Sequence, residues 1–166
     1  LRRQRQMCIR DSVQGIGIGV PGPVDSQGVV HRCVNLGWGV VNVAEELGNL
    51  TGLKIKVGND ANVAALGEMW QGGAKGSKDV IMVTLGTGVG GGIIVDGKVV
   101  AGFNGAGGEI GHITVNNDEI EACNCGQYGC LEQYTSATGI VRLAKRKLAK
   151  STEETSIREI PNLTAK

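Results

Sequence analysis

The sequence predicts an α/β fold, and three observations lead to this expectation. Short apolar segments of strand character alternate with segments of helical pattern, as is typical of α/β proteins. Glycine or proline turns separate several of these segments. In addition, 28 of the 166 residues are glycine, against roughly 7% in average proteins. Eleven of these glycines lie between Gly86 and Gly111, which indicates tight turns and close backbone approach rather than a linker.

Five segments are expected to form strands, because they are short and apolar. They are 13–20 (VQGIGIGV), 28–31 (GVVH), 53–57 (LKIKV), 79–85 (DVIMVTL) and the hairpin 92–100 (GIIVDGKVV). In 13–20 apolar residues alternate with glycine, so one face of that strand is very small. We expect 79–85 to be a buried strand. The hairpin turn is expected at Asp96–Gly97.

Helices are expected in three segments, which are 42–50, 59–71 and a stretch near 136–150. For the first, Asn42 can cap the N-terminus, Glu45 stands at the capping-box position and Gly52 follows the end. The charge is unevenly spread: residues 1–11 carry four arginines, whereas 12–141 carry six basic and twelve acidic side chains. This acidic body makes a nucleic-acid surface unexpected. The five basic residues of 142–150 are most simply a solvated helix face.

The chain has five cysteines, which are Cys8, Cys33, Cys123, Cys125 and Cys130. Their odd number, their clustering and the lack of a secretory signal argue against a disulfide framework and favour the reducing cytoplasm. The apolar stretch 80–95 is too short and too rich in glycine to span a bilayer.

Three of these cysteines crowd into residues 123–130, CNCGQYGC. Three thiolates and one imidazole complete a tetrahedral zinc site of the structural kind. His112 is the better candidate for the fourth ligand, because His31 lies far upstream. The alternative is a group of buried or redox-active thiols.

Two carboxylates flank this cluster in sequence. Glu109 precedes His112 by three residues, and Glu132 follows Cys130 by two. Binding His112 and Cys130 to one ion brings both carboxylates into one region, where fixed acceptors suit sugar hydroxyls. His112 could also bind zinc through one ring nitrogen and donate to a sugar oxygen from the other. Alone, each glutamate would more often be a surface or capping acid.

The segment GTGVGG contains the spacing G-x-G-x-x-G at Gly86, Gly88 and Gly91. A dinucleotide-binding turn must open a helix, yet a strand and hairpin are expected here. A glycine turn between strands can still bind phosphate through its backbone N–H groups, and Thr87 adds a hydroxyl. The alternative is a flexible hairpin without a ligand.

Asp60 lies between an expected strand and an expected helix. It can be the helix N-cap, or a general base at the carboxyl end of a strand, where ligands gather in α/β sheets. Asn59 beside it could hold a hydroxyl. The residues alone do not decide between these roles.

Together these segments resemble the ROK family of repressors, open reading frames and sugar kinases, from about Gly15 to Lys150. GEIGH followed by CNCGQYGCLE resembles the zinc signature of that family. LGTGVGGGIIVDGK resembles its second phosphate loop, and GNDANVAALGE its catalytic-aspartate segment. Within the family, the sequence is most similar to the bacterial glucokinases.

The resemblance implies an actin-like (ribonuclease H-like) two-domain ATPase fold with the sugar in the interdomain cleft. It implies ATP-dependent phosphorylation of glucose at the 6-hydroxyl, the entry to glycolysis, with Mg²⁺ accompanying ATP and with Asp60 as the base. The sugar ligands that it implies are Asn59, Asp60, Glu109, His112 and Glu132, with Gly22 and Asn35 at the border. The residues that it assigns to the ATP phosphates are Gly86, Thr87, Gly88 and Gly90.

Two parts of the family pattern are not found, namely an Asp-x-Gly-Gly-Thr phosphate and magnesium loop and a C-terminal adenosine region. We therefore expect a fragment that is inactive alone. Residues 1–12 are expected to be a non-native or disordered tail, 13–63 the rest of an N-terminal domain, and 64–166 the first part of a C-terminal domain. The full-length protein is expected to form a homodimer or higher homo-oligomer. The alternatives are a sugar-responsive repressor with an N-terminal helix-turn-helix, and a kinase for N-acetylmannosamine or fructose.

Overall fold

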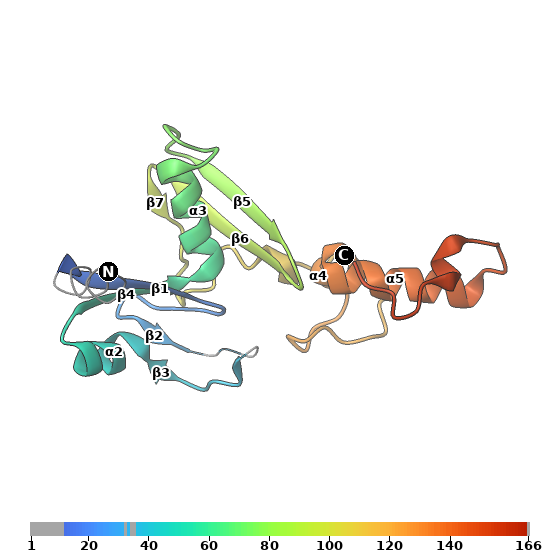
Figure 1. Cartoon of the computed structure of the whole chain (residues 1–166), viewed down its shortest axis with the longest axis horizontal. Helices are drawn as coiled ribbons and strands as arrows, with labels where there is room; N and C mark the ends of the chain where they lie inside the picture. The colour runs from blue at the N-terminus through green and yellow to red at the C-terminus, as the bar shows by residue number, and fades with distance from the viewer. Residues whose placement is uncertain (1–11, 32, 34–35, 166) are drawn as a thin grey trace, which may run out of the picture. The chain divides into compact units, whose positions relative to one another are not determined.

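The computed structural model describes residues 12–31, 33 and 36–165, and strands alternate with helices along it (Figure 1). The elements are β1 (Gly15–Val20), β2 (Val29–Val30), β3 (Val41–Asn42), α2 (Val43–Thr51), β4 (Lys54–Asn59), α3 (Asp60–Gln71), β5 (Val80–Leu85), β6 (Val89–Val95), β7 (Lys98–Val99), the 3₁₀ turn η2 (Ile110–His112), α4 (Glu132–Thr135), α5 (Ala137–Lys150) and the 3₁₀ turn η3 (Ser156–Glu159). The predicted α/β class is confirmed.

The described chain divides into two compact units. Unit 1 holds the described residues up to Val80 together with Gly92–Gly107. Unit 2 holds Ile81–Gly91 together with the described residues from Gly108 onward. The expected boundary between two domains at residues 63 and 64 stays a prediction.

Unit 1 is built around the parallel pair of β1 and β4, in which Gly15 lies opposite Lys54 and Val20 opposite Asn59. Two parallel strands need a long connection between them, and here it carries the antiparallel pair β2–β3 and helix α2. Helix α2 packs against β4 and β2 (Figure 1). Strand β1 therefore ends in the same direction as β4.

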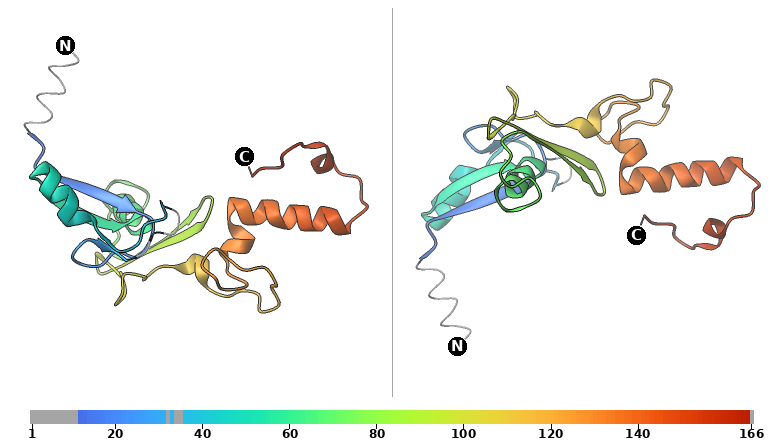
Figure 2. Two further views of the ribbon diagram at one scale, coloured as in Figure 1. Left: turned by 90° about the horizontal axis from the view of Figure 1, so that it is seen from below. Right: turned by 90° about the horizontal axis from the view of Figure 1, so that it is seen from above.

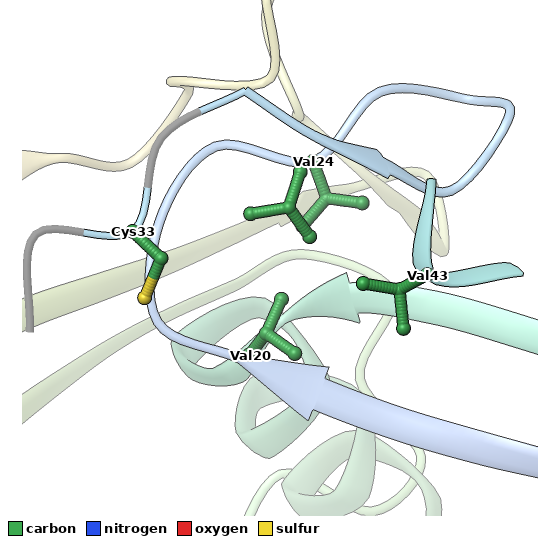
Figure 3. Close-up of a cluster of buried hydrophobic side chains, with 5 residues drawn as sticks. Val20, Val24, Cys33 and Val43 are labelled. Carbon is green, nitrogen blue, oxygen red and sulfur yellow. The ribbon is translucent and has the colours of Figure 1, made fainter. Parts of the chain in front are cut away.

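The end of β1 and residues of this connection together form a small apolar core (Figure 3). Its buried members are Val20, Val24, Val30, Cys33 and Val43. Cys33 is only 1% exposed, so this cysteine serves as an apolar core residue and takes no part in the cysteine cluster.

The helix ends follow from local sequence. In α2 the Asn42 side chain accepts from the Glu45 N–H at 3.1 Å and donates to the Glu45 carboxylate at 2.8 Å. Gly52 ends this helix in the left-handed region, with φ of 69°, where glycine carries no penalty. The predicted capping of α2 is confirmed. The expected helix near 136–150 is also confirmed as α5, and its N-cap is Ser136.

The glycine turn is shorter than the sequence suggested. Strand β6 already begins at Val89, so only residues 86–88 remain as the turn. Gly92 lies within β6, directly against α3, where an added Cβ would lie 2.6 Å from the Ala61 carbonyl oxygen and from the Ala65 Cβ. Gly92 therefore serves close helix–strand packing rather than a turn.

The expectation that 79–85 forms a buried strand is wrong. The side chains of Ile81, Val83 and Leu85 are 75%, 49% and 67% exposed. Val80, Met82 and Thr84 on the other face of β5 are half-buried, so the described residues partly cover one face only. A fully buried strand needs cover on both faces. Sequence analysis also missed β3, α4 and the 3₁₀ turns η2 and η3, which are all four residues or fewer.

In unit 2 the chain turns back after α5 and runs along this helix (Figure 2). Ile157, Ile160 and Leu163 of the returning segment lie around Leu148 of α5. The helices in the described part of the chain are too short or too polar to cross a membrane.

Candidate functional site

Unit 2 brings together the four predicted metal ligands. The ligand atoms of His112, Cys123, Cys125 and Cys130 all lie within 4.8 Å of one another. The Sγ atoms of Cys125 and Cys130 are 3.6 Å apart, and Cys123 Sγ lies 3.8 Å from His112 Nδ1. In a tetrahedral zinc site with Zn–S bonds of about 2.3 Å, neighbouring sulfur atoms are about 3.8 Å apart. The donor set and its spacing therefore fit a tetrahedral metal ion.

The raised pKa values of Cys123 and Cys130 also indicate that the cluster needs a metal ion to hold its cysteines as thiolates. Burial raises the pKa of the Cys130 thiol to about 12 and also raises the pKa of Cys123. Neighbouring thiols add to the effect at Cys130. Three thiolates so close together need a cation to offset their charge, and a bound metal ion deprotonates the thiols that bind it.

Tight backbone turns set the cysteines in place. The Cys123 N–H donates to the Gln127 carbonyl at 2.7 Å, and the Cys123 carbonyl accepts from the Gly126 N–H at 2.8 Å. Gly129 adopts φ of 71°, and a side chain there would collide with the Asn116 backbone. The glycines of CNCGQYGC thus allow the loop to fold back on itself.

A buried ion network fastens the cysteine loop to α4 and α5. Glu119 is 6% exposed, and its carboxylate lies 2.9 Å from Arg142 and 3.0 Å from Arg146. Tyr134 donates to the same carboxylate at 2.7 Å. The Tyr134 hydroxyl, assisted by the Glu121 N–H and both arginines, lowers the pKa of Glu119 to about 2, against the opposing effect of burial.

This network corrects the interpretation of 142–150 as a solvated basic face, because Arg142 and Arg146 bind a buried carboxylate. Sequence reasoning missed Glu119 as well. Opposite charges 23 and 27 residues apart give no local signal of pairing. Gln133 adds a further link, since its side chain accepts from the Cys130 N–H at 3.1 Å and donates to the Glu121 carbonyl at 2.9 Å.

Glu132 contacts both the cysteine cluster and the glycine turn. Its Oε2 accepts from the Val89 N–H at 2.9 Å, and its Oε1 lies 4.0 Å from Cys123 Sγ. Unit 2 thus places one predicted sugar ligand, Glu132, beside the metal ligands. Glu109 lies at the start of the 3₁₀ turn that carries His112, and its carbonyl accepts from the His112 N–H at 3.1 Å.

The glycine turn is held by the N-terminus of α5. The Gly86 N–H donates to the Gly88 carbonyl at 2.9 Å, which closes the turn. The Gly86 carbonyl accepts from the Ala137 N–H at 2.8 Å, and the Thr87 carbonyl accepts from the Thr138 hydroxyl at 2.8 Å. Of the predicted phosphate ligands, Gly86, Thr87 and Gly88 form the turn. Gly90 lies in β6.

The predicted base lies in unit 1, where β4 meets α3. Asn59, not Asp60, is the N-cap, because its side-chain oxygen accepts from the Asn62 N–H at 3.1 Å. The capping role considered for Asp60 is therefore wrong. Asp60 is exposed at the first helical position, with one oxygen accepting from the Ala61 N–H at 2.9 Å.

Both polar atoms of the Asn59 side chain make hydrogen bonds. In addition to its cap, its amide donates to the Gly22 carbonyl at 3.2 Å. This bond links two residues that the resemblance places at the sugar. The roles of the predicted sugar and phosphate ligands stay predictions, and Asn35 lies outside the described residues.

Comparison with known proteins gives consistent matches. The family model described as "ROK family" matches residues 4–166. A glucokinase of Halalkalibacterium halodurans is 50% identical over 131 residues, which make up 78% of this chain and 40% of that protein. A xylose repressor of Caldicellulosiruptor bescii is 36% identical over 143 residues, which make up 86% of this chain and 36% of the repressor.

A solved structure agrees with these matches. The crystal structure of a ROK family glucokinase from Streptomyces griseus in complex with glucose and AMPPNP gives a TM-score of 0.76 at 40% identity. The similarity covers 88% of this chain and 47% of that one, and it confirms the predicted actin-like α/β fold. The chain spans less than half the length of each of these three relatives.

Proposed function

The chain belongs to the ROK family, and from this premise we propose that it is part of an ATP-dependent sugar kinase that phosphorylates glucose at the 6-hydroxyl. The observation that carries the proposal is the position of Glu132. One carboxylate borders the Cys3His cluster and also holds the first residue after the glycine turn. A proposed sugar ligand in direct contact with a proposed phosphate-binding turn suits a kinase.

Phosphoryl transfer needs positioning and charge neutralisation more than covalent chemistry by the protein. Asp60 accepts the proton of the sugar 6-hydroxyl while the oxygen of this hydroxyl forms a bond to the γ-phosphorus and ADP leaves. The exposed carboxylate of Asp60 is available for this role, because Asn59 already caps α3. The Thr87 and Gly88 N–H groups of the glycine turn donate hydrogen bonds to the negatively charged phosphate oxygens.

His112, Cys123, Cys125 and Cys130 would hold zinc. Such an ion supplies no reacting group here, because its four ligands close the coordination shell. Since Nδ1 of His112 faces Cys123, the other ring nitrogen remains to donate to a sugar hydroxyl. Glu109 and Glu132 would accept hydrogen bonds from neighbouring sugar hydroxyls, and Asn59 would bind a further hydroxyl. Mg²⁺ would accompany ATP.

A second candidate is a sugar-responsive repressor, which the match to the xylose repressor favours. Both candidates would bind a sugar. They differ at Asp60, because a repressor has no proton to remove. A kinase for N-acetylmannosamine or fructose is a further form of the first candidate. A cytoplasmic location and a homo-oligomer are part of the proposal.

The test is ATP-dependent phosphorylation by the complete protein with glucose, N-acetylmannosamine and fructose as separate substrates. The proposal expects turnover, with the highest kcat/KM for glucose. A higher kcat/KM for another hexose would correct the substrate and keep the kinase. If the protein phosphorylates none of the three sugars and binds DNA in a sugar-dependent manner, the kinase proposal is contradicted and the repressor function is supported.

A further inference from the structure

A chain of hydrogen bonds runs from the first turn of α5 to the glycine turn. The Thr138 hydroxyl lies 2.8 Å from the Thr87 carbonyl oxygen and 3.0 Å from Ser136 Oγ. Ser136 Oγ also accepts from the Gly139 N–H at 2.9 Å. Ser136 is fully buried, so its hydroxyl is shielded from water.

The direction of this chain follows from the chemistry of its members. A carbonyl oxygen only accepts, so Thr138 must donate its single hydroxyl proton to Thr87. Thr138 is then the acceptor in its contact with Ser136, and Ser136 must be the donor. Each group therefore has one role, and the bonds run in order from Gly139 through Ser136 and Thr138 to Thr87.

The anchored carbonyls fix the peptide planes of the turn. In a trans peptide, the carbonyl of one residue and the N–H of the next point in opposite directions, and no described peptide bond is cis. Because Thr138 holds the Thr87 carbonyl, the Gly88 N–H points away from α5. The Ala137 N–H holds the Gly86 carbonyl in the same way, so the Thr87 N–H also points away from α5.

We propose that Thr138, oriented by Ser136, is a positioning residue that keeps the Gly88 N–H turned toward the nucleotide phosphate. This inference rests on the proposed kinase function. Without the Thr138 hydroxyl, the Thr87–Gly88 peptide plane is free to rotate, and the turn presents a carbonyl oxygen to the phosphate for part of the time. Within the described part of the chain, the hydrogen bonds of the Thr138 hydroxyl join it to Ser136 and to the turn. Loss of this hydroxyl should therefore weaken the binding of ATP and not the binding of the sugar.

The experiment compares Thr138→Val with Thr138→Ser in the complete protein. Valine keeps the shape but lacks the hydroxyl, and serine restores the hydroxyl. We expect Thr138→Val to raise the KM for ATP by about threefold to tenfold, the equivalent of one neutral hydrogen bond. The KM for glucose should stay unchanged, and Thr138→Ser should behave like the wild type. Thr138→Ala serves as a second variant if valine impairs folding.

Thr135→Val is the matched control. Its hydroxyl also donates to a carbonyl at 3.1 Å, but that carbonyl belongs to Leu131, which lies outside the turn. If Thr138→Val raises both KM values alike, or matches Thr135→Val throughout, the residue is merely structural and the inference is overturned.

Calorimetric binding of AMP-PNP separates this inference from the proposed function. If Thr138→Val loses affinity for AMP-PNP and the protein phosphorylates no sugar, the role of Thr138 is supported and the proposed kinase activity is contradicted. If the protein is an active kinase and Thr138→Val leaves its ATP affinity unchanged, the proposed function is supported and the role of Thr138 is contradicted. A complete protein that binds no nucleotide contradicts both.

Discussion

Oε2 of Glu132 accepts a hydrogen bond from the backbone N–H of Val89 at 2.9 Å, which joins the first residue of α4 to the first residue of β6. The same carboxylate occupies the space beside Gly88, where any side chain would collide with it. The glycine at position 88 and the glutamate at position 132 are therefore complementary. In the proposed kinase, Glu132 would contact the phosphate turn and the sugar at once.

Two substitutions at Glu132 separate these roles. Glutamine keeps an oxygen for the Val89 N–H but loses the charge, so Glu132→Gln should raise the KM for glucose about tenfold while the KM for ATP stays near normal. Alanine loses both, so Glu132→Ala should raise both KM values. Steady-state kinetics of the complete protein check this pattern. Equal effects of the two variants on both substrates would contradict the dual role.

We expect one zinc ion per chain. Cys125 is the exposed member of the cluster, so Cys125→Ser should lose the metal with little direct effect on packing. Cys33→Ala is the control, because this cysteine lies in the core of unit 1, and it should keep the zinc. Elemental analysis of purified, reduced protein measures both. Full zinc content in Cys125→Ser would show that the cluster is not the site.

Glu119 should make the stability of unit 2 depend on pH. Its pKa falls from an ordinary value of 4.5 to about 2 in the folded chain, so the folded state binds this proton less readily than the unfolded state. The stabilisation is therefore complete above pH 4.5 and is lost as the pH falls toward 2. Removing one member of a buried ion network costs about 3 kcal/mol, which Glu119→Gln should show at pH 7.

Chemical denaturation of the wild type and of Glu119→Gln at several pH values tests this expectation. The gap between the two midpoints should narrow between pH 4.5 and pH 2. Glu121→Gln is the control, because its carboxylate is 50% exposed and should contribute at most about 1 kcal/mol. A gap that stays constant down to pH 2 would mean that the ion network does not stabilise the fold.

Local sequence patterns predicted much of the fold. The cap at Asn42, the end of α2 at Gly52 and the hairpin turn at Asp96–Gly97 each depend on a few neighbouring residues, and the structure shows all three. The Cys3His cluster was predictable for the same reason, since three of its ligands lie within eight residues. Residues within a single turn or loop determine such features, so a local sequence pattern can predict them.

Long-range contacts were not predictable. The pairing of Glu119 with Arg142 and the contact of Glu132 with Val89 each join residues more than twenty positions apart, and no periodicity marks them. The exposure of Ile81 on β5 could not be read from its apolar sequence either, because burial depends on what covers the strand. At Asp60 the sequence allowed a cap, but Asn59 had the better geometry for it.

The measurement that tests the account most directly is the turnover of Asp60→Asn in the complete protein, with glucose and ATP as substrates. Since Asn59 caps α3, the substitution should leave the melting temperature, zinc content and glucose affinity nearly unchanged. Its kcat should fall by roughly a hundredfold or more, because asparagine cannot take the proton. Glu46→Gln, an exposed acid in the first turn of α2, is the control and should stay fully active. A folded Asp60→Asn variant with near-normal kcat would contradict the assignment of Asp60 as the base and, with it, the proposed mechanism.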